Sequence, residues 1–138
     1  NGKMSEYHAA VGLAELDGWA VKRAGLRHVA DRYRHAALAR GLRLHAASEV
    51  SSCYVLFEAA TEREAERAQA LLRGAGIDYR FWYGTGLHRE RYFRTHTRDP
   101  LPVVEALASR LIGLPVAPDL PDAVVDRFVA ALAEFGDR

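Results

Sequence analysis

The sequence predicts an α+β fold, in which helices pack against a small, mostly antiparallel sheet. Three observations support this expectation. Apolar residues recur at helical spacing in several segments, and short apolar runs of strand type lie between these segments. With 138 residues, 49% of them hydrophobic, and no internal repeat, the chain is long enough for one core and too short for two comfortable domains.

The first forty residues are expected to form two helices. Ser5 is placed to cap the first helix, and Gly18 interrupts the apolar pattern that follows. A second helix continues from Trp19 to a stop at Gly41, with basic residues on its other face. The apolar face of the first helix holds Ala9, Ala10, Leu13 and Leu16, and that of the second holds Leu26, Ala30, Tyr33 and Ala37.

Three strands and one helix are predicted in the middle of the chain. Residues 42–47 and 53–60 predict two strands joined by a polar turn, and residues 77–83 predict a third strand rich in aromatic residues. Thr61 and Glu64 form a capping box for the helix before that third strand. This helix is expected to pack Ala65, Ala68, Leu71 and Leu72 and to end at Gly74 or Gly76.

The C-terminal part is predicted to contain two helices separated by extended chain. A long irregular segment, GTGLHRERYFRTHTRDP, covers residues 84–100. Pro102 suits the first turn of a short helix that continues through Leu111. Residues 112–121, IGLPVAPDLP, are expected to be extended and rich in turns. The last helix is expected to bury Val125, Phe128, Val129, Leu132 and Phe135.

Charge and cysteine content argue against several classes of protein. The formal net charge is +1, from 19 basic and 18 acidic residues, so no global field favours nucleic acid or an anionic membrane. No apolar run approaches the roughly 20 residues that span a bilayer. The single cysteine, Cys53, allows no internal disulfide and suits a reducing compartment. We expect a cytoplasmic protein without nucleic-acid or membrane partners.

Metal chemistry and nucleophilic catalysis find no support in the residue pattern. The six histidines form no HxxxH pair and no Cys/His pairing at ligand spacing, so no metal site is predicted. Cys53 lies in an apolar strand without a neighbouring base and is expected to be an inert buried thiol. Gly84 and Gly86 belong to a turn, because GTG lacks the spacing of a phosphate-binding loop. No catalytic residue is assigned in this chain.

Two stretches suit a ligand better than the rest of the chain. Residues 82–94, WYGTGLHRERYFR, interleave cations that grip phosphate with rings that stack on a base or sugar. A solvated basic loop pinned by its aromatic rings explains the same composition equally well. NGK at the start places an amide and a cation beside a helix N-terminus, where anions bind. The alternative is that these residues only precede an ordinary capped helix and bind no anion.

Four segments carry a resemblance, and they occur in the same order as in the family that they resemble. NGKMSEYHAAVGLAELD is similar to NxRMSELQAAxGLxQLxxLD, and residues 23–33 resemble an RRxxIAxxY helix. GIDYRFWYGTGLH is similar to GIxTRxxYxPPLH, and LIGLPVAPDLPDAVVDRFVAAL to LSLPxxPxLxxxxVxxVxxxL. These patterns are those of the DegT/DnrJ/StrS family of pyridoxal phosphate (PLP) dependent sugar aminotransferases. The resemblance covers essentially the whole chain.

Three departures from the family pattern are specific. Lys3 stands where the pattern has arginine, and EYH stands for ELQ. GTGLH, at residues 84–88, replaces the proline-containing PPLH. The resemblance implies that EYH and GTGLH lie on the substrate side of the site. These two departures therefore leave the substrate specificity open.

The resemblance implies that the chain is the C-terminal part of a larger enzyme similar in fold to aspartate aminotransferase. Residues 1–40 correspond to the helices that connect two domains, and residues 41–138 to the C-terminal small domain. The lysine that forms the Schiff base with PLP belongs to the large domain. Lys3 and Lys22 are the only lysines here, and neither lies in a similar motif. The fragment alone is therefore expected to be inactive and not to retain PLP.

The resemblance also implies partners and site residues. The parent is expected to be a homodimer that moves an amino group from an amino acid such as glutamate to a nucleotide-linked keto-sugar, in antibiotic or surface-glycan sugar biosynthesis. Asn1 and Lys3 are expected to reach the cofactor phosphate of the neighbouring subunit. Tyr83, His88 and Arg89 are expected to line the substrate entrance. A PLP-dependent sugar dehydratase of the same family and a non-catalytic nucleotide-binding α+β module are the alternatives.

Overall fold

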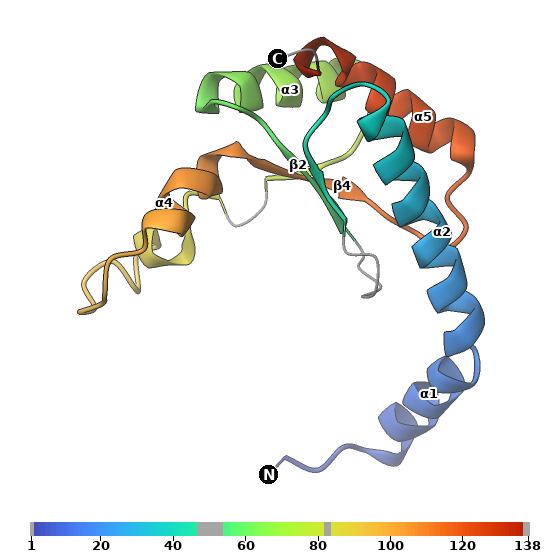
Figure 1. The fold of residues 1–138 in the computed structure, drawn as a ribbon. Coiled ribbons are helices and arrows are strands. Elements are labelled where there is room, and N and C mark those ends of the chain that lie inside the picture. Colours follow the sequence, from blue (N-terminus) through green and yellow to red (C-terminus); the bar gives the residue numbers. More distant parts are fainter. Residues whose placement is uncertain (1, 47–53, 82–83, 137–138) are drawn as a thin grey trace.

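A four-stranded antiparallel sheet lies at the centre of the computed structural model, which describes residues 2–46, 54–81 and 84–136 (Figure 1). The strands are β1 (Leu44–His45), β2 (Tyr54–Glu58), β3 (Arg80–Phe81) and β4 (Leu111–Pro115), in the order β1-β2-β4-β3 across the sheet. The helices are α1 (Glu6–Asp17), α2 (Trp19–Leu38), α3 (Glu62–Gly74), α4 (Pro102–Leu107) and α5 (Asp122–Ala131). The predicted α+β architecture with a small antiparallel sheet is confirmed.

The two central strands, β2 and β4, turn one face toward the helices. Along β2, Val55 and Phe57 are buried and their neighbours are only half-buried. The register places Val55 opposite Leu114 and Phe57 opposite Ile112, so apolar side chains gather on one side of the sheet. The alternate residues of β2 and β4 point to the opposite side of the sheet, which we call the open face. They are Tyr54, Leu56, Glu58, Leu111, Gly113 and Pro115.

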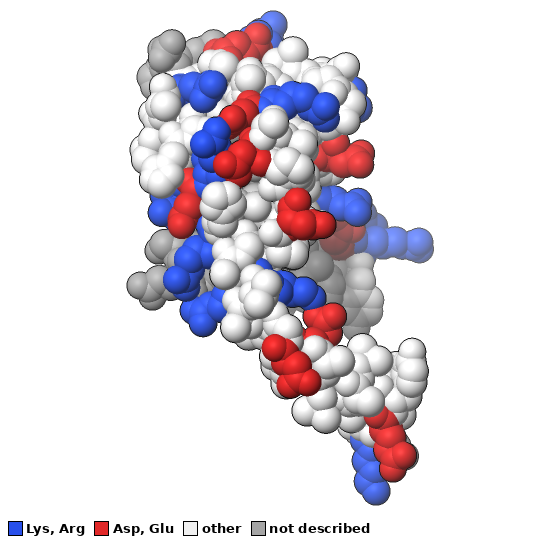
Figure 2. Space-filling view, turned by 90° about the vertical axis from the view of Figure 1, so that its right-hand side faces the viewer, with Lys and Arg blue, Asp and Glu red and all other residues white. Residues whose placement is uncertain are grey.

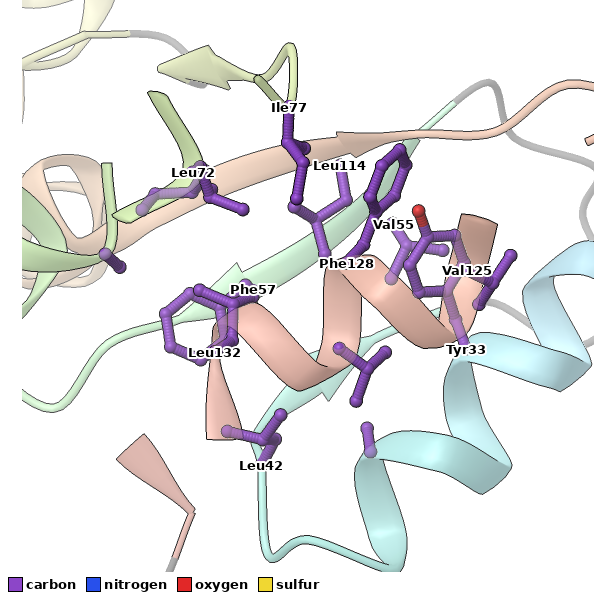
Figure 3. Packing of buried hydrophobic residues seen from close by; sticks show 14 of the residues in the cluster. Tyr33, Leu42, Val55, Phe57, Leu72, Ile77, Leu114, Val125, Phe128 and Leu132 are labelled. Carbon is purple, nitrogen blue, oxygen red and sulfur yellow. The ribbon is translucent and has the colours of Figure 1, made fainter. Parts of the chain in front are cut away.

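Helices α2, α3 and α5 cover the apolar side of the sheet and complete one core (Figure 3). Tyr33 of α2 is fully buried, and its ring stacks on Phe128 with centroids 6.4 Å apart. Its hydroxyl donates to the carbonyl of Pro115 at 3.1 Å. Burial raises the pKa of the Tyr33 hydroxyl, which therefore remains a donor. The largest fully buried side chains are Tyr33, Phe57, Leu72, Ile112, Leu114 and Leu132.

Helix α2 approaches the C-terminal segment closely because it carries a glycine there. A Cβ at Gly25 would lie 2.4 Å from the carbonyl oxygen of Pro118, so a larger residue cannot occupy this position without a backbone shift. Two turns further along α2, Arg32 Nε donates to Asp126 of α5 at 3.1 Å. This hydrogen bond lowers the pKa of the Asp126 carboxyl. Figure 2 shows the same side of the molecule, where basic and acidic side chains alternate without a single-sign patch.

The predicted starts of α1 and α3 are confirmed. Ser5 caps α1, since its Oγ accepts a hydrogen bond from the amide of His8 at 3.3 Å. Thr61 caps α3 in the same way, through the amide of Glu64 at 3.2 Å. The Glu64 carboxylate accepts in turn from the amide of Ala60 at 3.1 Å.

The prediction that the helix after Pro102 continues through Leu111 was wrong, because a central strand begins at Leu111. Leu111 begins β4 and does not belong to a helix, since α4 ends at Leu107 and a 3-10 turn, Ala108–Arg110, follows. Gly113 and Pro115 are poor strand formers and hide this strand from a local interpretation. Its pairing with both β2 and β3 outweighs their low propensity.

The edge strands are shorter than predicted, and one helix position is exposed. Strand β1 covers two residues of the range 42–47, and β3 two residues of the range 77–83. Leu71 was expected in the core but is 38% exposed, and Leu72 takes the core-facing position. The predicted polar turn and Cys53, at residues 47–53, lie outside the described residues, as do residues 82–83.

Helix α1 buries none of its residues within this chain. Figure 1 shows it at the far end of α2, extending away from the sheet. An exposed row of apolar side chains such as that on α1 is typical of a surface on which another protein surface packs. Its exposed members are Tyr7, Ala10, Val11, Leu13 and Leu16.

We expect the 138-residue chain to fold but to self-associate as its concentration rises. The apolar side chains of α1 leave water when two such surfaces meet. A Leu13→Glu, Leu16→Glu double variant should lower the average mass measured by light scattering, whereas Glu6→Gln on the same helix should not. A wild-type chain that stays monomeric at every concentration contradicts this expectation.

Candidate functional site

The predicted site residues lie on two separate arms of the structure. The N-terminal arm comprises residues 2–17 and carries Lys3, and the α4 arm comprises residues 84–107 and carries His88 and Arg89. Figure 1 shows the arms at different ends of the molecule, so one chain does not bring Lys3 together with His88 or Arg89. The other two predicted site residues, Asn1 and Tyr83, lie outside the described residues.

Lys3 on the N-terminal arm is exposed, and the described part of the chain offers it no hydrogen bond or ion pair. It stands just before the Ser5 cap of α1. The first-turn amides of a helix have no intrahelical acceptor, apart from those that the cap satisfies. A free ammonium group beside these amides favours an anion, although Glu6 in the first turn adds a competing negative charge.

The α4 arm begins with two glycines in unusual backbone conformations. Gly84 has φ 53° and Gly86 has φ 100°, values that glycine adopts far more readily than other residues. A single 3-10 turn, Leu87–Arg89, follows directly. The arm therefore holds Arg89 exposed on its surface and packs His88 inside.

His88 has an unusual environment for a residue in a loop. Its side chain is 6% exposed, and its Nε2 is buried without a hydrogen-bond partner in the described structure. The nearest carboxylate oxygen belongs to Glu105 of α4, at 3.6 Å from Nε2. The other side of the ring faces Gly86, where a Cβ would lie 2.6 Å from Cε1 and 2.8 Å from Nδ1.

Aromatic rings and cations gather beyond the 3-10 turn. Tyr92 packs edge-on against Phe93 with centroids 4.9 Å apart, and its ring lies 5.2 Å from that of His96. Tyr92 remains 72% exposed, so much of its ring is open to a ligand. The exposed arginines of the same segment are Arg89, Arg91, Arg94 and Arg98. The predicted mixture of cations and rings is thus present, and the rings also stabilise the arm.

A hollow of about 330 Å³ lies beside β3, where sequence reasoning assigned no role. Arg80 pairs in register with Gly113 and so lies on the open face. Asp78, two residues earlier, lines the same hollow. Alternating polar residues at the start of a strand are the signal that identifies such a surface. The hollow is lined by Tyr54, Asp78, Tyr79, Arg80 and Pro115.

Within residues 2–46, 54–81 and 84–136, no group of three or more His, Cys, Asp or Glu side chains is arranged to hold a metal ion. Among the described helices, none is long and apolar enough to cross a membrane.

Known proteins resemble this chain over nearly its whole length. Protein Rv3402c of Mycobacterium tuberculosis (strain ATCC 25618 / H37Rv) is 33% identical over 141 residues, which cover 97% of this chain and 34% of that protein. Protein Mb3436c of Mycobacterium bovis (strain ATCC BAA-935 / AF2122/97) shows the same identity and coverage. The chain thus spans about a third of the length of the curated relatives that it matches.

Solved structures share the fold. A putative PLP-dependent aminotransferase from Bacillus cereus ATCC 10987 superimposes with a TM-score of 0.83 at 22% identity, over 96% of this chain and 37% of that one. DesI, crystallised in the presence of its TDP-sugar product, gives a TM-score of 0.83 at 26% identity, over 100% of this chain and 37% of that one. The family model for the DegT/DnrJ/EryC1/StrS aminotransferases matches residues 1–133. This chain therefore belongs to the DegT/DnrJ/EryC1/StrS aminotransferase family.

Proposed function

We propose that this chain is the C-terminal part of a PLP-dependent aminotransferase that transfers an amino group from an amino acid such as glutamate to a nucleotide-linked keto-sugar. The observation that carries the proposal is the family match over residues 1–133, supported by the likeness to DesI with its TDP-sugar product. In this proposal residues 1–40 connect two domains, and residues 41–138 form the small domain.

Asn1 and Lys3 are the residues through which this chain would hold the cofactor. The exposed ammonium of Lys3 before the first turn of α1 suits a phosphate dianion, because both an ammonium and free helix amides are donors that such an anion accepts. Bound PLP supplies the electron sink for amino transfer. In one chain Lys3 lies far from the α4 arm, and this separation supports a homodimer in which Lys3 serves the neighbouring subunit.

The α4 arm is proposed to line the substrate entrance. Arg89 presents an exposed guanidinium, which pairs well with phosphate oxygens. Tyr92 presents an exposed ring, on which a base or sugar can stack. Both groups suit a nucleotide-linked substrate, and Tyr83 and His88 belong to the same entrance in this proposal.

The full-length protein provides the test of this function. Addition of PLP should produce visible absorbance, and supply of glutamate with a nucleotide-linked keto-sugar should yield an amino-sugar product. The 138-residue chain alone should show no turnover, because Lys3 and Lys22 are its only lysines and catalytic groups act as a unit. A dehydrated sugar without amino transfer, or failure of the full-length protein to bind PLP, contradicts the proposal.

Alanine at Tyr83, His88 or Arg89 of the full-length enzyme should raise the KM for the nucleotide-linked sugar. Loss of one charge-assisted or aromatic contact corresponds to roughly a tenfold change. PLP affinity should change much less, because the cofactor phosphate is proposed to be held by Asn1 and Lys3 and not by these residues. Arg63→Ala, an exposed position on α3, is the matched control. An unchanged KM at all three positions would return the loop to a purely structural role.

A further inference from the structure

The buried imidazole of His88 is a feature that the proposed function does not explain. Of the two buried polar side chains in the described core, Glu64 is hydrogen-bonded, whereas Nε2 of His88 has no hydrogen-bond partner. A buried polar atom without a partner costs stability, so such atoms are rare and call for a specific reason. The reason should lie in the groups that surround the ring.

Glu105 is the group that faces the unpartnered nitrogen. Its Oε1 lies 3.6 Å from Nε2, beyond an ordinary hydrogen bond but within reach of a small side-chain rotation. A carboxylate only accepts hydrogen bonds, so it favours the ring form that carries the proton on Nε2. The neutral ring then has its lone pair on Nδ1.

Gly86 adjoins the opposite edge of the ring. A Cβ at this position would lie 2.8 Å from Nδ1 and 3.1 Å from a methyl group of Val104, so any side chain would displace the imidazole. The family pattern that this segment resembles has proline here, and proline fixes φ near −65°. Gly86 has φ 100°, which proline cannot adopt. The packing of His88 therefore depends on a departure of this chain from the pattern.

We infer that Glu105 is a positioning residue, which holds His88 as the Nε2–H tautomer and so leaves Nδ1, beside Gly86, as a hydrogen-bond acceptor. Glu105 thereby ties the 3-10 turn, Leu87–Arg89, to α4 and fixes the direction in which the entrance loop presents its residues. A hydroxyl that reaches the Gly86 edge can donate a hydrogen bond to Nδ1, whereas a carbonyl or ionised phosphate oxygen, which only accepts, cannot. The link to a substrate hydroxyl rests on the proposed function, but the tautomer does not.

Nitrogen NMR on the ¹⁵N-labelled chain tests the tautomer directly. Long-range ¹H–¹⁵N correlations at mildly alkaline pH, where imidazoles are neutral, should show His88 protonated at Nε2. Glu105→Gln should keep this tautomer, because the amide oxygen also accepts from Nε2–H. Glu105→Ala should produce a mixture of tautomers. Glu90→Ala, an exposed glutamate of the same arm, should leave the His88 nitrogen shifts unchanged.

Two outcomes of this experiment overturn the inference. One is a wild-type His88 protonated at Nδ1, and the other is an unchanged tautomer in Glu105→Ala. Because Glu105 is half-exposed, its variants should fold, and the backbone amide spectrum verifies this. Gly86→Ala is a second probe that acts from the other side of the ring. It should shift the His88 ring signals, because a Cβ there would lie 2.6 Å from Cε1 and 2.8 Å from Nδ1 of the ring.

Kinetics of the full-length protein test the positioning role. Glu105→Ala should raise the KM for the nucleotide-linked sugar about tenfold with unchanged PLP affinity, as loss of a group that orients a ligand-binding side chain commonly does, and Glu105→Gln should restore it. An unchanged KM in Glu105→Ala, despite a lost tautomer, would overturn the positioning role. A full-length protein without aminotransferase activity would refute the proposed function, while the nitrogen shifts would still decide the tautomer.

Discussion

Phe57→Ala is expected to lower the free energy of unfolding of the chain by about 3–5 kcal/mol. Phe57 is 1% exposed on β2, lies opposite Ile112 in the register and has its ring centroid 6.0 Å from that of Phe135. Removal of the ring leaves a cavity between the sheet and the C-terminal turn, which the surrounding side chains fill only in part. Since domains of this kind have about 5–15 kcal/mol in total, the loss should remove a large fraction of the stability of the chain.

Leu56→Ala is the matched control, because Leu56 is the next residue of the same strand and lies on the open face. It is half-buried, so its truncation removes less apolar area from contact and should cost clearly less stability. Urea unfolding of both variants measures the difference as a shift of the midpoint at constant slope. Equal losses of stability in the two variants would mean that both faces of β2 are equally buried, which would contradict the alternating burial along this strand.

Local signals allowed the helices to be predicted well. Ser5 and Thr61 satisfy backbone amides within three residues, so a capping pattern in the sequence is enough to locate α1 and α3. Gly18 separates α1 from α2 in the same local manner. The apolar residues of α5 also follow a helical period and are buried where the period places them.

Strand β4 could not be predicted because its pairing is not local. Its partner residues in β2 lie far earlier in the sequence, for example Phe57 opposite Ile112, a separation of 55 residues. Gly113 and Pro115 lower the strand propensity of the segment, and only the neighbours on both sides supply the missing stability. Leu111 also continues the apolar spacing of the preceding helix, so the sequence pattern assigned it to that helix although it belongs to the strand.

The candidate site was predictable in its residue types but not in its geometry. The sequence indicated Arg89 as an accessible cation, and the structure describes it as exposed. The burial of His88 depends on the positive φ of Gly86 and on Glu105, which approaches only because α4 folds back toward the loop. A glycine in place of a family proline was the available signal, and its consequence appears only in three dimensions.

In the full-length protein, Lys3→Ala is expected to weaken PLP binding by about ten- to a hundredfold, since a charge-assisted hydrogen bond contributes roughly 1.5–3 kcal/mol. The exposed ammonium of Lys3, at the N-terminus of α1, is proposed to contact the cofactor phosphate of the neighbouring subunit together with Asn1. Lys3→Arg should keep most of the affinity, because it keeps the charge and adds a planar pair of donors.

Lys22→Ala is the control, because it removes the other lysine of the chain, whose side chain pairs with Glu15 and not with a ligand. PLP dissociation constants should be measured by absorbance titration at concentrations where every variant is a dimer, since a contact across subunits is lost in a monomer. Lys22→Ala should then bind PLP like the wild type. If Lys3→Ala also does so, Lys3 is a solvated residue before a helix, and the cofactor phosphate is held by other groups.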